Sequence, residues 1–275
     1  MGKSRVGDSI LMIENSIFEF NEMIKDIYHL LLRTSRMVSH KRNIIVKEKH
    51  RSDFVTNLDY AVEEFLIDGL REIENIPCLT EETNQRVMLN SFWAIDPIDG
   101  TTNFIHGYPS YCISIAKVHN GITMYGFVFN LVTKELFVGI KGNGAYLWTS
   151  RAGRQRKIHV SDTLWIDNSL IGFGCPYDKN KTDRIFAITN NILKHCHDVK
   201  RNGPASLDLC YVACGRLDAY YEFDLKEWDY KAGKLILEEA GGKLTDWYGE
   251  DIWEGTSSIV ASNSRIHTQV LEYLR

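Results

Sequence analysis

The stretch from Trp93 to Phe104, which reads WAIDPIDGTTNF, most constrains what this chain can fold into. Its apolar beginning predicts a buried strand that ends at Asp96 and Asp99, with a proline between the two acids. Gly100 follows, and the threonines after it predict the start of a short helix. Two carboxylates in this position suit a hard cation with oxygen ligands, Mg²⁺ above all, and the glycine and helix amides suit a phosphate. An isolated Asp-Pro-x-Asp-Gly is more often an ordinary surface turn, so the surrounding residues have to decide.

The composition is that of a globular protein. The chain has 275 residues, of which 44% are hydrophobic and 25% charged, enough for one large domain or two closely packed ones. A net charge of −4 predicts neither a nucleic-acid nor an anionic-membrane partner. The six cysteines show no zinc-finger spacing, so we expect free thiols. No secretory signal or membrane-length apolar run is evident, and we expect a cytoplasmic protein.

The pattern of the first half predicts long helices and an antiparallel sheet. Apolar residues at helical spacing predict a helix over 10–38. A strand over 44–46 and a polar loop over 47–52 are expected next, and then a helix from Thr56 or Asn57 to about Glu74. Tight turns at Asn-Gly and Gly-Asn-Gly predict a meander of strands between 111 and 148. The basic stretch 151–157 is expected to be a loop.

From residue 169 onward, strand patterns alternate with helix patterns, which is typical of α/β structure. We therefore predict two parts. Residues 1–150 would form an N-terminal α+β half with long helices and an antiparallel sheet, and residues 151–275 a C-terminal α/β half.

Three further acids stand out, although each has a structural explanation when taken alone. Asp53 precedes the cap of a helix, so capping does not account for it, but it could be a solvated loop acid. Glu81 ends a short strand and could be plain surface charge. Asp229 begins a helix, where an acid is electrostatically favourable in any case.

Together these stretches resemble the signatures of the inositol monophosphatase family, which lies within the superfamily that includes fructose-1,6-bisphosphatase. DFVTNLD at 53–59 is similar to the family's D-x-V-T-x-x-D, and TEE at 80–82 to its G-E-E. RNGPASLDLC at 201–210 resembles R-x-G-S-A-A-L-D-L-C, with Pro204 and Ser206 as departures. EWDYKAG at 227–233 resembles W-D-x-A-A-G. The resemblance implies an α/β (α+β) fold, a layered αβαβα sandwich with the site between its two halves.

The resemblance also implies roles for single residues. Asp53 and Thr101 would orient the attacking water, and Glu81 and Asp99 complete the catalytic set. Two to three Mg²⁺ ions would be held by Glu81, Asp96, the carbonyl of Ile98, Asp99 and Asp229. The substrate would be bound by Gly100, Thr101, Thr102, Ala205, Glu222 and Asp229. In GCPY at 174–177, Cys175 stands where the family usually has Phe, so that wall of the pocket could differ.

The implied function is Mg²⁺-dependent hydrolysis of a small polyol phosphate monoester, inositol 1-phosphate first, by a lithium-sensitive homodimer. Two alternatives stay open. One is a broader phosphatase for sugar bisphosphates, NADP or 3′-phosphonucleotides. The other is a non-catalytic regulatory or binding member, since some relatives contact RNA-polymerase machinery. A Walker-A nucleotide-binding protein is excluded, because the chain lacks G-x-x-x-x-G-K-[ST].

Overall fold

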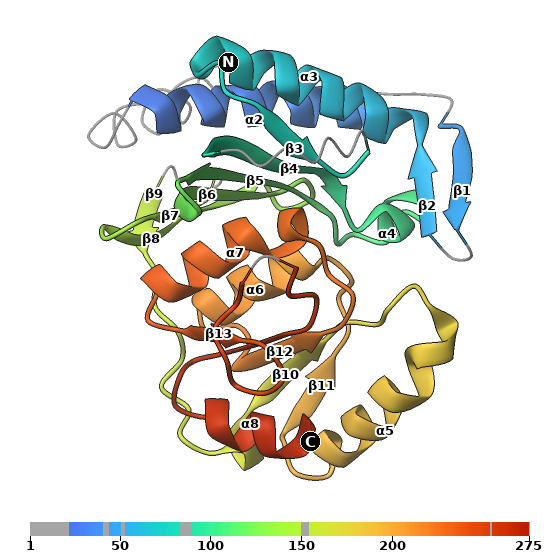
Figure 1. Cartoon of the computed structure of the whole chain (residues 1–275), viewed down its shortest axis with the longest axis vertical. Helices are drawn as coiled ribbons and strands as arrows, with labels where there is room; N and C mark the ends of the chain where they lie inside the picture. Colours follow the sequence, from blue (N-terminus) through green and yellow to red (C-terminus); the bar gives the residue numbers. More distant parts are fainter. Residues whose placement is uncertain are drawn as a thin grey trace, which may run out of the picture.

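Five layers stack in the structure, a computed structural model that describes residues 22–40, 44–50, 53–82, 90–149, 154–253 and 255–274. In Figure 1, two long helices lie over a seven-stranded sheet, and a second helix pair lies on the other face of that sheet. A five-stranded sheet follows, and two further helices cover its far side. The predicted αβαβα arrangement is confirmed. No helix in the described part of the chain is long and apolar enough to cross a membrane.

The larger sheet has the strand order β3-β4-β5-β6-β7-β8-β9. β3 pairs with β4 in parallel, and each later pair of neighbours is antiparallel, so the predicted meander is confirmed. The strands are β3 (Cys78–Thr80), β4 (Ser91–Asp99), β5 (Cys112–His119), β6 (Ile122–Asn130), β7 (Glu135–Ile140), β8 (Gly144–Thr149) and β9 (Arg154–Lys157).

The outer helices of this sheet are α2 (Glu22–His40) and α3 (Asn57–Ile73). Strand β4 alternates its side chains between the two faces of the sheet. Trp93 and Ile95 join the core under α2 and α3, whereas Ala94 joins the core on the opposite face. The helix predicted over 10–38 is confirmed from residue 22 on, and its earlier part lies outside the described residues.

Two stretches predicted as loops form strands instead. Residues 47–50 belong to β1 (Val46–His50), which pairs antiparallel with β2 (Asp53–Thr56), and the basic stretch ends in β9 at the sheet edge. Both loop predictions were wrong. The polar residues of these two stretches do not alternate with apolar ones, so the sequence gives no strand pattern there. Charged side chains are nevertheless well suited to edge strands, where they discourage pairing with other chains.

The smaller sheet has the order β11-β10-β12-β14-β13. β10 runs parallel to β11 and β12, and β14 runs antiparallel to β12 and β13. The strands are β10 (Leu170–Phe173), β11 (Asp198–Lys200), β12 (Ala219–Glu222), β13 (Lys243–Thr245) and β14 (Ile259–Ser262), and the helices are η1 (Ile166–Asn168), η2 (Lys179–Lys181), α5 (Thr182–Leu193), α6 (Ala205–Ala213), α7 (Glu227–Glu239) and α8 (His267–Leu274).

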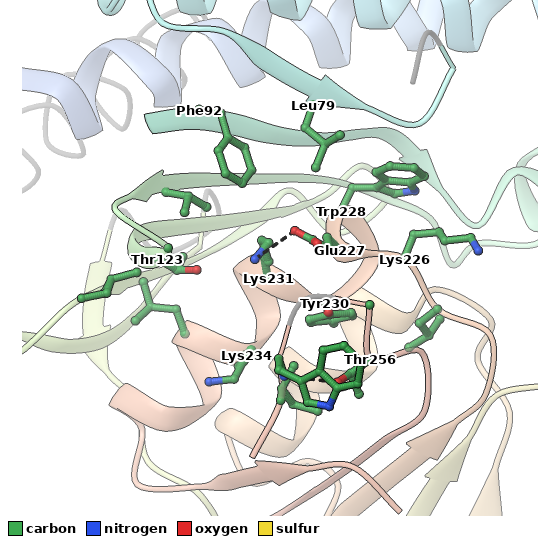
Figure 2. A pocket seen from close by; sticks show the side chains of 18 of the residues that line it. Leu79, Phe92, Thr123, Lys226, Glu227, Trp228, Tyr230, Lys231, Lys234 and Thr256 are labelled. Atoms are coloured by element: carbon green, nitrogen blue, oxygen red, sulfur yellow. Dashed lines mark hydrogen bonds and ion pairs between the residues drawn. The ribbon is translucent and has the colours of Figure 1, made fainter. Parts of the chain in front are cut away.

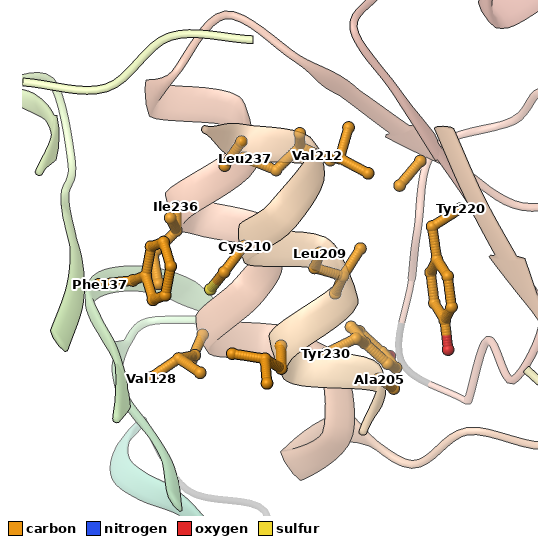
Figure 3. Close-up of a cluster of buried hydrophobic side chains, with 14 of the residues drawn as sticks. Val128, Phe137, Ala205, Leu209, Cys210, Val212, Tyr220, Tyr230, Ile236 and Leu237 are labelled. Atoms are coloured by element: carbon orange, nitrogen blue, oxygen red, sulfur yellow. The ribbon is translucent and has the colours of Figure 1, made fainter. Parts of the chain in front are cut away.

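Helices α6 and α7 form the layer between the two sheets, and Figure 3 shows their shared core. The sheet comes close to α7 at two glycines. A Cβ on Gly126 would lie 2.6 Å from the carbonyl oxygen of Ala232, and one on Gly139 would lie 2.9 Å from Cα of Ile236. This core joins the two sequence halves, and β9 continues the first sheet past residue 150. The domain boundary at that residue stays a prediction.

Candidate active site

The end of β4 presents the central motif. Asp96 is 2% exposed, and its Oδ1 accepts a hydrogen bond from the Ile98 amide at 3.0 Å. The pairing of β4 with β5 shifts register between Asp96 and Asp99, so the strand is locally irregular where both acids stand. The predicted strand and the short helix after it are confirmed, the helix as α4 (Thr101–Ile105).

Gly100 caps α4 in the left-handed conformation, with a φ of 93°, which favours glycine. Space is also limited there. A Cβ would lie 2.9 Å from Cγ of Pro204 and 3.0 Å from the carbonyl oxygen of Ser110. Pro204, one of the departures from the family pattern, therefore packs against the glycine of the predicted phosphate site.

The beginning of α6 ties two of the predicted metal ligands together. The Ser206 amide donates to Oδ2 of Asp99 at 2.8 Å, and the Ser206 hydroxyl donates to the carbonyl oxygen of Asp229 at 2.7 Å. The buried Cys112 thiol also contacts Oδ2 of Asp99, at 3.8 Å. Asp99 and Asp229 are 130 residues apart in the chain (229 − 99), and Ser206 links them from between the two sheets.

Asp229 lies in the first turn of α7, where its Oδ2 accepts from the Lys226 amide at 2.6 Å. The turn is also held from β5, because the Ser114 hydroxyl donates to the carbonyl oxygen of Trp228 at 3.1 Å. The capping role considered for Asp229 is thus real, and it does not exclude a second role for the other carboxyl oxygen.

Glu81 follows β3, and the next residue is held from α3. The amide of Glu82 donates to Oε2 of Glu63 at 2.9 Å. Glu63 is 2% exposed, so this bond lies under the helix and fixes the backbone beside Glu81. Thr80 stands where the family usually has glycine. The segment is nevertheless extended, since Thr80 ends β3.

The four acids interact electrostatically. Burial, and then repulsion from Glu81, Asp99 and Asp229, raises the pKa of Asp96 well above its usual value. Burial raises the pKa of Asp99 to about 7, although the Ser206 amide works in the opposite direction. Burial and the charge of Asp99 raise the pKa of Asp229 as well.

The acids are not gathered around one point. Within the described residues no three His, Cys, Asp or Glu side chains meet as a ready metal site. One oxygen of Asp99 and one of Asp229 are instead bonded to backbone amides. The donors fit a hard cation in kind, because they are carboxyl oxygens and one backbone carbonyl, and a positive ion would offset the mutual repulsion of the acids.

The hydroxyl of Thr101 lies between two acceptors. It is 3.0 Å from the carbonyl oxygen of Ile98 and 3.3 Å from Oδ1 of Asp59. Asp59 also completes the predicted cap of α3, since its Oδ2 accepts from the amide and hydroxyl of Thr56. Asp53 begins β2, and its side chain lies outside the described residues, so its pairing with Thr101 stays a prediction.

The predicted substrate residues of the second half come from α6 and β12. Ala205 begins α6 and is buried, and Glu222 ends β12 and is 7% exposed. Burial raises the pKa of Glu222 well above its usual value, and a hydrogen bond from Tyr220 works against this. Of the residues in α4, Thr101 is buried and Thr102 is exposed.

A separate cavity of about 1320 Å³ opens along the other side of α7 (Figure 2). Leu79 and Phe92 line it from β3 and β4, and Trp228 and Lys231 from α7. Lys231 pairs with Glu227 at 3.1 Å, across the wall of this cavity. None of the predicted site residues lines it, although Trp228 stands next to Asp229 in the chain.

Sequence reasoning missed several residues that hold the site: Asp59, Glu63, Ser114, Ser206 and Tyr220. The two acids carried a usable signal. They are four residues apart, on the helix face that buries Leu58, Val62 and Leu66, and acids on a buried face require partners. The serines carried none, because each of their contacts with a distant segment involves a backbone group, either their own amide or a carbonyl oxygen of the α7 turn.

Comparisons with known proteins agree with the architecture. The model of the inositol monophosphatase family matches residues 14–275. A putative Nus factor SuhB from Neisseria meningitidis serogroup B is 38% identical over 227 residues, covering 81% of this chain and 85% of the relative.

Solved structures show the same fold. The extragenic suppressor protein suhB of Bartonella henselae matches with a TM-score of 0.85 and 28% identity, over 93% of this chain and 99% of that one. An inositol monophosphatase from Anabaena (Nostoc) sp. matches with a TM-score of 0.78 and 32% identity, over 91% and 94%. An IMPase/NADP phosphatase complexed with NADP and Ca²⁺ matches with a TM-score of 0.77 and 25% identity, over 92% and 94%. The chain therefore belongs to the inositol monophosphatase family.

Proposed function

We propose that this protein is a Mg²⁺-dependent phosphatase that hydrolyses a small polyol phosphate monoester, inositol 1-phosphate first. The observation that supports this most is the link made by Ser206 between Asp99 and Asp229. It ties the backbone of Asp229, in the second half, to the carboxyl of Asp99, which directly precedes Gly100 in the chain. Membership in the family supports the same reaction class.

Glu81, Asp96, Asp99, Asp229 and the carbonyl of Ile98 would hold two to three Mg²⁺ ions. Bound Mg²⁺ supplies positive charge that offsets the phosphate and makes a neighbouring water more acidic. The neighbour complexed with Ca²⁺ supports a divalent cation in this fold. By the same resemblance we expect Li⁺ to inhibit turnover and the chain to form a homodimer.

The protein's own groups would then position the reactants. The amides at the start of α4, with Gly100 and Thr102, would hold phosphate oxygens. The Thr101 hydroxyl, oriented by carboxylates around it, would direct the attacking water. Since hydrolysis of this kind needs positioning and charge stabilisation rather than a covalent intermediate, no nucleophilic side chain is assigned.

Release of inorganic phosphate tests the proposal directly. The wild type is treated with chelator and assayed on inositol 1-phosphate with and without millimolar Mg²⁺. We expect hydrolysis only with Mg²⁺, and loss of at least about a hundredfold in Asp99→Asn. Asp162→Asn is a matched control, because the Asp162 side chain is 95% exposed. Hydrolysis that survives chelation, or an Asp99→Asn variant with full activity, would count against the reaction.

A second candidate is a binding role in transcription, with or without catalysis. The observation that favours it is the 38% identity to a putative Nus factor SuhB. A pull-down from bacterial extract with wild type and with Asp99→Asn would separate the roles. Capture of transcription proteins by both forms, with no phosphate release by the wild type, would support the binding role alone.

A further inference from the structure

Strand β12, which carries the predicted substrate contact Glu222, also carries a buried tyrosine that the function above does not use. Tyr220 and Glu222 are two residues apart in the strand, so their side chains lie on the same face. The Tyr220 hydroxyl donates a hydrogen bond to Oε2 of Glu222. Tyr220 is completely buried and Glu222 nearly so, which makes the bond a shielded one.

Gly174 closes the other side of the Glu222 carboxyl. It follows β10, the parallel neighbour of β12, and its amide donates to the carbonyl oxygen of Tyr221 at 3.0 Å. A Cβ at Gly174 would overlap the carbon and both oxygens of the Glu222 carboxyl. A larger residue at position 174 would displace the carboxyl from this place, so the carboxyl packs directly against Gly174 on one side and is bonded to Tyr220.

The direction of Tyr220 connects this arrangement to the predicted substrate pocket. In Figure 3 its hydroxyl points toward the N-terminal end of α6, where Ala205 lies. Ala205 and Glu222 are both predicted substrate contacts. Tyr220 therefore contacts Glu222 on the side away from the substrate. It is not itself one of the predicted substrate contacts.

We propose that Tyr220 is a positioning residue that sets the selectivity for the alcohol part of the substrate. Its bond occupies Oε2 of Glu222, so Oε1 is the oxygen left to accept from a substrate hydroxyl at one fixed place. A ligand with a hydroxyl there is favoured over a phosphate ester without one, whose binding leaves the carboxyl unpaired. This inference rests on the proposed function, because it assigns the substrate class of that same site.

Tyr220→Phe tests the bond, since it keeps the ring and removes only the hydroxyl. The matched control is Tyr221→Phe. Tyr221 is the next residue of the strand, is equally buried, and bonds to the Thr189 hydroxyl at 2.8 Å on the opposite face. Both variants lose one buried hydrogen bond, and only the first loses the bond to Glu222.

The readout is the ratio of kcat/KM for inositol 1-phosphate to kcat/KM for phenyl phosphate, which has no hydroxyl on its alcohol part. We expect Tyr220→Phe to lower this ratio about tenfold, mainly through KM for inositol 1-phosphate, and Tyr221→Phe to leave the ratio unchanged. Glu222→Gln in the Tyr220→Phe background should lower it little further, because both changes weaken the same contact between residue 222 and the substrate hydroxyl. An unchanged ratio in Tyr220→Phe, or an equal fall in Tyr221→Phe, overturns the proposal.

Calorimetry of inositol 1-phosphate binding in the presence of Ca²⁺ separates this inference from the proposed function. A wild type that binds the ligand, with affinity about tenfold lower in Tyr220→Phe, supports the role of Tyr220 even if no phosphate is released. A wild type that releases phosphate, with equal affinity in both forms, refutes the role of Tyr220 and leaves the phosphatase standing. A wild type that does not bind inositol 1-phosphate overturns the inference.

Discussion

The hydroxyl of Thr101 lies 3.3 Å from Oδ1 of Asp59, although 42 residues separate the two in the chain. The contact joins the first turn of α3 to the first turn of α4. The same hydroxyl is 3.0 Å from the carbonyl of Ile98, so its single proton is shared between two acceptors. Asp59 thus influences where the lone pairs of Thr101 point, and with them any water that this hydroxyl holds.

Two acids are candidates for orienting Thr101: Asp59, which contacts its hydroxyl, and Asp53, which the family resemblance implies. Variants of the two can be compared. We expect Asp59→Asn to lower kcat at least about tenfold, since the charged acceptor is lost. By family resemblance Asp53→Asn should lower turnover strongly too and leave Mg²⁺ binding nearly intact. Asp68→Asn is the control, because its side chain is 71% exposed on the same helix. Full turnover in Asp59→Asn would leave the role to Asp53 alone, and full turnover in Asp53→Asn would remove it from Asp53.

Metal removal should be visible in stability as well as in activity. Asp96 is buried, Asp99 and Asp229 are half-buried, and their carboxyls repel one another, so a bound cation stabilises the folded chain by mass action. We expect millimolar Mg²⁺ to raise the melting temperature of chelator-treated wild type by several degrees, and that of Asp99→Asn by much less. Differential scanning calorimetry measures both. Equal shifts in the two proteins would show that the stabilising ion binds elsewhere.

Asp208 should make stability depend on pH. It is fully buried, and among the described residues its Oδ2 has no hydrogen-bond partner, while Oδ1 accepts from Asn202 at 2.6 Å. Burial raises the pKa of Asp208 to about 8 from a model-peptide value of 3.8. The folded chain therefore binds one more proton than the unfolded chain between these two values, and stability falls as pH rises through that window.

The comparison of wild type with Asp208→Asn isolates this effect. We expect the stability of the wild type relative to the variant to fall by up to about 1 kcal/mol per pH unit between pH 5 and about 8. Urea unfolding at several pH values measures it. Parallel pH profiles for the two proteins would show that Asp208 does not change its protonation on unfolding.

The close approach of α7 to the sheet predicts that Gly126→Ala is destabilising. The new Cβ would press on the backbone of Ala232, which cannot move without shifting the helix that carries Asp229. We expect a loss of about 1–3 kcal/mol in the free energy of unfolding, with lower turnover. Gly107→Ala separates packing from backbone strain, because Gly107 has a φ of 67° and open space around it. A Gly126→Ala variant as stable as the wild type would mean that the helix adjusts freely.

The fold could be predicted largely from local patterns, and the exceptions share a cause. Strand β4 was readable from its continuous apolar run, and helix α3 because its buried apolar residues repeat with the helical period. β1 and β9 were not readable, since polar edge strands show no such period. β11 and β13, of three residues each, are too short to show one.

The candidate site divides in the same way. Asp96, Asp99 and Gly100 lie in one stretch, and this stretch together with its neighbouring residues predicted a metal and phosphate site. The contacts that hold this stretch come from elsewhere, such as the amide of Ser206 and the carboxyl of Asp59. A backbone amide has no sequence signature, and nothing in the pattern of a helix states which distant residue its first turn will meet.

A substrate panel tests the central claim most directly. We would measure kcat/KM with Mg²⁺ for inositol 1-phosphate, fructose 1,6-bisphosphate, NADP and 3′-phosphoadenosine 5′-phosphate, in the wild type and in Glu222→Gln. The account predicts that the wild type prefers inositol 1-phosphate, with some hydrolysis of the others, and that Glu222→Gln loses about tenfold on inositol 1-phosphate. A wild type that prefers a nucleotide, or that releases phosphate from none of the four, would contradict it.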